Sequence, residues 1–113
     1  MNTTLGMDQR RRDILAELAG LARIRRGSVT EQYVEATGRR GRTVRRGPYP
    51  LYSFKTKGRT VSRRIRAEQS AVYREQIAAG RRFQELTREL MELGEALCEQ
   101  DLRTDAVKKT PNA

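Results

Sequence analysis

Hydrophobic and polar residues alternate between Gly47 and Arg66, and a glycine lies midway along the stretch. Alternation of this kind is typical of a half-buried strand. The pair Lys57-Gly58 suits a two-residue turn, because Gly58 can adopt a positive φ. The pattern therefore predicts a β-hairpin in which Phe54 lies opposite Val61.

The predicted hairpin has one apolar and one basic face. The apolar face carries Tyr52, Phe54, Val61 and Ile65. The other face carries Tyr49, Leu51, Lys55, Thr60, Ser62, Arg64 and Arg66. A shift of one residue would exchange the faces, so the apolar pattern specifies the register. We expect the apolar face to cover the core together with Tyr33 and Val72.

A helix is predicted before the hairpin. Apolar residues recur mostly at three- and four-residue spacing between Asp8 and Arg26, which is typical of an amphipathic helix. Asp8 is suited to the N-cap, and Gly27 is suited to end the helix. Residues 1–7 are expected to be disordered.

Two further segments lie between this helix and the hairpin. Residues 28–36 are rich in β-forming types and predict a first strand. Residues 38–46 contain five arginines and two glycines, and they predict a mobile basic loop or an extended connection between strands.

A long helix is predicted after the hairpin, from about Ala67 to residue 103. The stretch lacks proline, and its apolar residues form a heptad-like row. We expect this row to be covered by the N-terminal helix, by a second copy of the chain or by another protein. The residues assigned to this helix interface are Phe83, Leu86, Leu90, Leu93 and Leu97.

The predicted fold is α+β: an N-terminal helix, a three-stranded antiparallel sheet and a long C-terminal helix. One domain is expected over residues 8–103, because 113 residues suffice for a modest core. Residues 104–113 are expected to form a flexible tail.

Basic charge is concentrated in the predicted sheet. The net charge of the chain is +10. Residues 27–66 hold eleven arginines or lysines against two acids, whereas residues 67–113 hold more acids than bases. Arginine presents a planar fork of donors that suits phosphate oxygens and the acceptor edge of guanine. The candidate nucleic-acid-binding residues are Arg39, Arg40, Arg42, Arg45, Arg46, Tyr49, Lys55, Lys57, Arg59, Arg64 and Arg66.

Several kinds of chemistry are disfavoured by composition. The chain has one cysteine, Cys98, and no histidine, so neither an internal disulfide nor a cysteine-based zinc site is expected. We expect no cofactor and no metal. No arrangement of nucleophile and base or Gly-rich phosphate loop is found, and we expect no enzymatic activity. Without a long apolar run or signal peptide, a cytoplasmic protein is expected.

Three stretches together resemble a small, uncharacterised bacterial domain family that occurs among plasmid, phage and transposon genes. They are GSVTEQY at 27–33, GPYPLYSFKTKGRTVSRRI at 47–65 and YREQIAAGRRFQELTRELMEL at 73–93. Many members carry several cysteines before Gly-Pro-Tyr, which would imply a metal site. This chain has arginines there instead, so a metal role does not carry over.

These observations lead to two functional hypotheses. The first is a nucleic-acid-binding module, for duplex DNA more than RNA, that presents its basic sheet and loop to phosphates. The second is a protein adaptor or inhibitor that acts through the long acidic helix. Replacing the loop arginines should abolish the first activity and leave the second unchanged.

Overall fold

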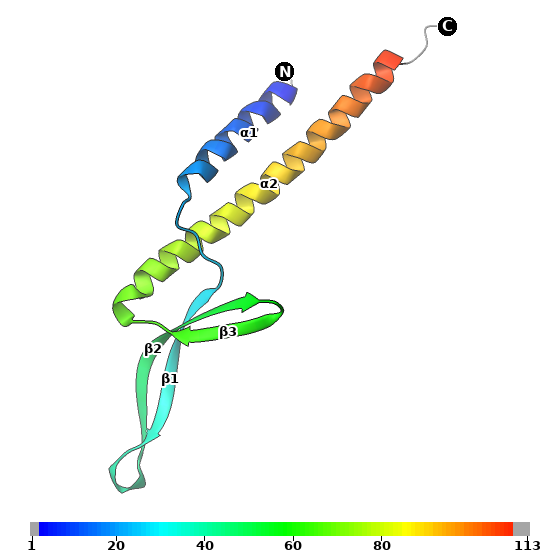
Figure 1. The fold of residues 1–113 in the computed structure, drawn as a ribbon. Helices are drawn as coiled ribbons and strands as arrows, with labels where there is room; N and C mark the ends of the chain where they lie inside the picture. Colours follow the sequence, from blue (N-terminus) through cyan, green and yellow to red (C-terminus); the bar gives the residue numbers. More distant parts are fainter. Residues whose placement is uncertain (1–2, 110–113) are drawn as a thin grey trace. The chain divides into compact units, whose positions relative to one another are not determined.

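A computed structural model describes residues 3–109 and shows the predicted α+β fold (Figure 1). Three antiparallel strands form one sheet in the order β1-β2-β3. The chain divides into a sheet unit, residues 23–81, and a helical unit, residues 3–22 with 82–109. The elements are α1 (Thr3–Gly20), β1 (Ser28–Thr37), the 3-10 turn η1 (Arg39–Gly41), β2 (Thr43–Thr56), β3 (Arg59–Arg64), the 3-10 turn η2 (Ala67–Gln69) and α2 (Ser70–Lys109).

The helix boundaries differ from those predicted. Helix α1 starts at Thr3 rather than at Asp8, and it ends at Gly20 rather than at Gly27. Residues beyond Gly20 leave the helix and contact α2 instead: the backbone N–H of Arg25 donates to the carbonyl of Gln76 at 3.0 Å. Helix α2 continues through the predicted tail to Lys109, and the remaining tail residues, like residues 1–2, lie outside the described range.

The register of the β2–β3 hairpin is the predicted one. Phe54 pairs with Val61, and Lys55 pairs with Thr60. Lys57 and Gly58 have φ angles of 51° and 76°, the left-handed pair that a tight two-residue hairpin turn requires.

The predicted basic loop is shorter than expected. Residues 43–46 belong to β2 and pair with residues 34–37 of β1, so for these four residues the extended alternative is correct and the mobile loop is not. Thr43 and Val44 are β-branched and suit a strand. Arg45 and Arg46 are accommodated beside them because their side chains project into solvent.

The core of the sheet unit forms between the sheet and the start of α2. Tyr52, Ile65 and Ile77 are buried, and Phe54 and Tyr73 pack against them. The ring of Tyr52 lies 5.3 Å from that of Phe54 and 5.1 Å from that of Tyr73, centre to centre. Aromatic pairs at these distances add to the stability gained from burial.

Three residues that were expected in this core lie outside it. Tyr33 is 48% exposed and Val72 is 49% exposed, and Val61 of the apolar face is also exposed. Helix α2 covers the sheet with Tyr73 and Ile77, which are four residues apart and share one face of the helix. Val72 lies on a different face.

In the helical unit, α1 runs antiparallel to α2 (Figure 1). Ile14 and Leu86 are fully buried. Within the row predicted on α2, Leu90, Leu93 and Leu97 are half-buried. Phe83 is exposed, contrary to its assignment to a covered interface, and Cys98 is exposed as well.

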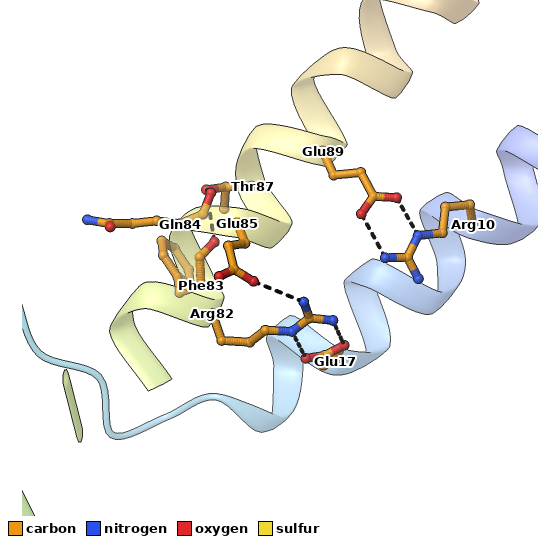
Figure 2. A network of polar contacts seen from close by, with 8 residues as sticks. All are labelled: Arg10, Glu17, Arg82, Phe83, Gln84, Glu85, Thr87 and Glu89. Carbon is orange, nitrogen blue, oxygen red and sulfur yellow. Dashed lines mark hydrogen bonds and ion pairs between the residues drawn. The ribbon is translucent and has the colours of Figure 1, made fainter. Parts of the chain in front are cut away.

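Two ion pairs fix the register of the helix pair (Figure 2). Arg82 donates from Nη2 to Glu17 at 2.8 Å, and Arg10 donates from Nη2 to Glu89 at 2.7 Å. These hydrogen bonds lower the pKa of both carboxyl groups below the ordinary value of 4.5. The pairs are seven residues apart on each helix, the spacing at which the same faces of two antiparallel helices meet again.

Candidate nucleic-acid interface

The ends of β1 and β2 that lie farthest from β3 form a two-stranded ribbon. We call residues 33–47 the β-arm. Strand β3 pairs with residues 51–56 of β2, so the described sheet has only two strands in the β-arm. Every residue from Arg39 to Pro48 is exposed. The tip and the β2 side of the β-arm are therefore open to a partner, whereas Val34 and Ala36 of β1 are half-buried.

A bulge marks the base of the β-arm. The ladder shifts between Gln32 and Val34, so Tyr33 faces two residues of β2, Gly47 and Pro48. The peptide bond between these two residues is cis. A bulge bends a strand pair and increases its twist, and it can thereby re-aim the residues beyond it.

The β-arm carries five arginines and one acid, Glu35. None of the five forms an ion pair with any acid in residues 3–109. Arg45 lies over the ring of Tyr33, with its guanidinium carbon 3.8 Å from the ring centre. This contact holds one guanidinium in place by a cation–π interaction and leaves its charge uncompensated.

Three of these arginines belong to the tip of the β-arm. The N–H of Gly38 donates to the carbonyl of Arg42 at 2.6 Å and closes the turn. Arg40 has a φ of 63°, a left-handed conformation that costs on the order of 1 kcal/mol for a residue with a side chain. The closed turn holds Arg39, Arg40 and Arg42 together at the end of the ribbon.

A second basic group lies on the outer face of the sheet, the face away from Tyr52. Tyr49, Lys55 and Arg64 share this face by strand alternation, as predicted. The guanidinium carbon of Arg64 lies 4.1 Å from the centre of the Tyr49 ring. Tyr49 is half-buried beneath it.

Three other predicted residues lie beside this face. Arg59 pairs with Thr56, and alternation places it on the side of Phe54 rather than on the outer face. Lys57 is in the hairpin turn, and Arg66 follows β3. All three are exposed.

The eleven predicted residues thus form two groups rather than one surface. Figure 1 shows that the β1–β2 and β2–β3 turns point in different directions from the centre of the sheet. One group is the β-arm with its five arginines. The other comprises the outer face and the β2–β3 turn.

Sequence reasoning missed two residues of this unit. Tyr33 was assigned to the core, but it supports Arg45 on the β-arm. Arg25 was assigned to α1, but its guanidinium carbon lies 4.2 Å from the centre of the Tyr73 ring, and its Nε donates to Gln76. The β-formers around residues 33–37 and 43–46, on either side of a Gly-rich turn, are the signal that could have revealed the ribbon.

Within residues 3–109, no three His, Cys, Asp or Glu side chains lie close enough together to hold a metal ion. None of the described helices combines the length and apolarity needed to cross a membrane.

Fold and surface together define a small α+β protein with a basic two-stranded arm. Residues 5–75 match the model of a domain of unknown function, DUF6788, and the chain belongs to that family. The match includes two of the three stretches that carried the resemblance and only the start of the third. No curated protein and no solved structure matches the chain.

Proposed function

We propose that this protein binds duplex DNA by laying the β-arm into the major groove. The observation that carries the proposal is a two-stranded ribbon whose five arginines are all exposed and have no acidic partner among the described residues. The major groove of B-DNA is about 12 Å wide and admits a two-stranded β-ribbon. The arginines at the tip and along the β2 edge then meet phosphates on the groove walls.

The outer face of the sheet supports the same proposal. Arg64 is oriented by Tyr49, and Lys55 lies on the same face without a described acidic partner. Such residues could contact the backbone beside the groove and fix the position of the protein on the duplex. The chain resembles a bacterial domain family that occurs among plasmid, phage and transposon genes, and on this basis we propose that it acts in a mobile-element or phage system in the cytoplasm.

Salt dependence tests the proposal. Six phosphate contacts, five from the β-arm and one from the outer face, would give a slope of roughly −5 for log affinity against log salt concentration. The variant Arg42→Ala should lower the magnitude of this slope by about 1. It should also weaken binding to unrelated DNA sequences to the same extent. Arg103→Ala on α2 is the matched control and should change neither affinity nor slope.

Two outcomes would contradict the proposal. One is the absence of binding to duplex DNA at about 50 mM salt, where contacts of this kind are strong. The other is binding that survives replacement of all five β-arm arginines. Either result would favour the adaptor hypothesis, in which α2 carries the activity.

A comparison of DNA with RNA tests the groove itself. The major groove of A-form RNA is deep and too narrow for protein side chains to read. We therefore expect double-stranded RNA of the same length to compete weakly for the protein. Equal competition would mean that the β-arm contacts phosphates from outside the groove.

A further inference from the structure

The pair formed by α1 and α2 has one closed and one open side. Each residue turns a helix by about 100°, so Arg82 and Glu89 fall on one side of the row through Leu86, and Thr87 and Gly94 fall on the other. The two interhelical ion pairs close the first side. No described ion pair between α1 and α2 closes the second.

The open side is apolar. An open groove of about 530 Å³ runs along α2 and is lined by Thr87, Leu90, Met91, Gly94, Glu95 and Cys98. Met91 is 66% exposed. Leu15 of α1 lies one position after the buried Ile14, on this same side, and is also exposed. Two helices alone leave such a face uncovered, whereas four helices can enclose it.

We propose that a second copy of this chain covers the groove, with its α2 packed antiparallel to this one near Gly94. Gly94 offers no side chain, and an added Cβ there would meet nothing within 4 Å. A small residue at this point allows the axes of two helices to approach closely. The arrangement has two-fold symmetry, which is usual for soluble homo-oligomers.

Charge complementarity favours a second copy over an unrelated partner. Arg88 lies six residues before Gly94, and Glu99 lies five residues after it, on the same flank of the groove. Antiparallel pairing about Gly94 brings Arg88 of each copy beside Glu99 of the other. Both residues are exposed, and neither forms an ion pair within residues 3–109.

Charge reversal tests this pairing. Arg88→Glu and Glu99→Arg should each weaken self-association of the protein. In either variant residues 88 and 99 carry the same charge, and they meet at two symmetric contacts in the dimer. Mixing the two variants should restore it, because opposite charges then meet at both positions. Sedimentation measures the association, and native mass spectrometry distinguishes the mixed dimer by mass. Arg103→Glu, on the face away from the groove, is the control and should associate like the wild type.

A disulfide tests the register without disturbing the charges. In the proposed dimer residue 91 lies beside Cys98 of the partner subunit, so Met91→Cys should form a covalent disulfide dimer when oxidised glutathione is added, which is reduced to two molecules of glutathione. Arg103→Cys is on the face of α2 away from the groove, and it should remain monomeric on a denaturing gel. A monomeric wild type, or equal cross-linking of both variants, would overturn the proposal. Neither experiment contains nucleic acid, so its result is independent of DNA binding.

Discussion

Arg63 donates a hydrogen bond from Nη2 to the hydroxyl of Tyr73 at 3.1 Å. Its guanidinium also lies 5.3 Å from the centre of the Tyr52 ring, so this arginine supports the core of the sheet unit. The next residue, Arg64, lies on the opposite face of β3 above Tyr49. Two adjacent arginines therefore have different roles because successive side chains of a strand point to opposite faces.

This alternation predicts that two neighbouring substitutions affect different properties, one the stability of the fold and the other DNA binding. Arg63→Ala should lower the free energy of unfolding by roughly 1 kcal/mol through loss of the hydrogen bond and the cation–π contact, and it should leave the salt slope of DNA binding unchanged. Arg64→Ala should weaken DNA binding and change stability little. Urea unfolding and salt titration of both variants check the pair; identical effects would contradict the face assignment.

Gly80 provides a test of the contact between α2 and the segment before β1. A Cβ added at Gly80 would come within 2.2 Å of the carbonyl oxygen of Arg25, a backbone atom. We expect Gly80→Ala to destabilise the protein by roughly 1 to 3 kcal/mol, despite the better helix propensity of alanine. A Cβ added at Gly6 in α1 would meet nothing within 4 Å, so Gly6→Ala should raise the free energy of unfolding by up to about 1 kcal/mol. Urea unfolding measures both, and a stabilising Gly80→Ala would contradict this packing.

The β2–β3 turn tests the need for left-handed backbone. Gly58→Ala should cost roughly 1 to 2 kcal/mol, because φ at this position is 76°. Lys57→Asn should be neutral or slightly stabilising, because asparagine tolerates the left-handed region better than lysine does. Thermal unfolding of the two variants measures the difference. Equal stability of Gly58→Ala and wild type would mean that the turn differs from the one described.

The helix pair should lose stability in acid. The pKa values of Glu17 and Glu89 are lowered in the folded state by hydrogen bonds from arginine. Both carboxylates therefore stabilise the fold above their unfolded pKa near 4.5, and this contribution is lost as the pH falls through the lower folded values. Replacing both by glutamine should lower the melting temperature at neutral pH, and the deficit should shrink in acid.

Glu92→Gln is the control for this experiment, because Glu92 is exposed and forms no described ion pair. Its melting temperature should follow that of the wild type across the whole titration. A deficit of the double variant that is independent of pH would show that the two carboxylates stabilise by packing rather than by charge. High salt should reduce the effect, because these pairs are partly exposed.

Local patterns predicted the parts of the fold that depend on neighbouring residues. Alternation around the Lys57-Gly58 turn was enough to place Phe54 opposite Val61, because a slip by one residue would expose the whole apolar face. The same patterns failed at element ends. Asp8 looks like an N-cap, but α1 begins earlier, because preferences for single cap residues amount to about 1 kcal/mol and packing can override them.

By itself, the sequence determined the fold class, the register of the second hairpin and the concentration of basic charge in the sheet. Only the tertiary structure decided how that charge is arranged. It placed five arginines on a two-stranded arm, because residues 34–37 and 43–46 pair across a turn whose high charge had suggested a loop. It also left Tyr33 outside the core, because packing against α2 reaches only the part of the sheet near Tyr52. Packing between the sheet and α2 joins residues far apart in the chain, and no local pattern contains it.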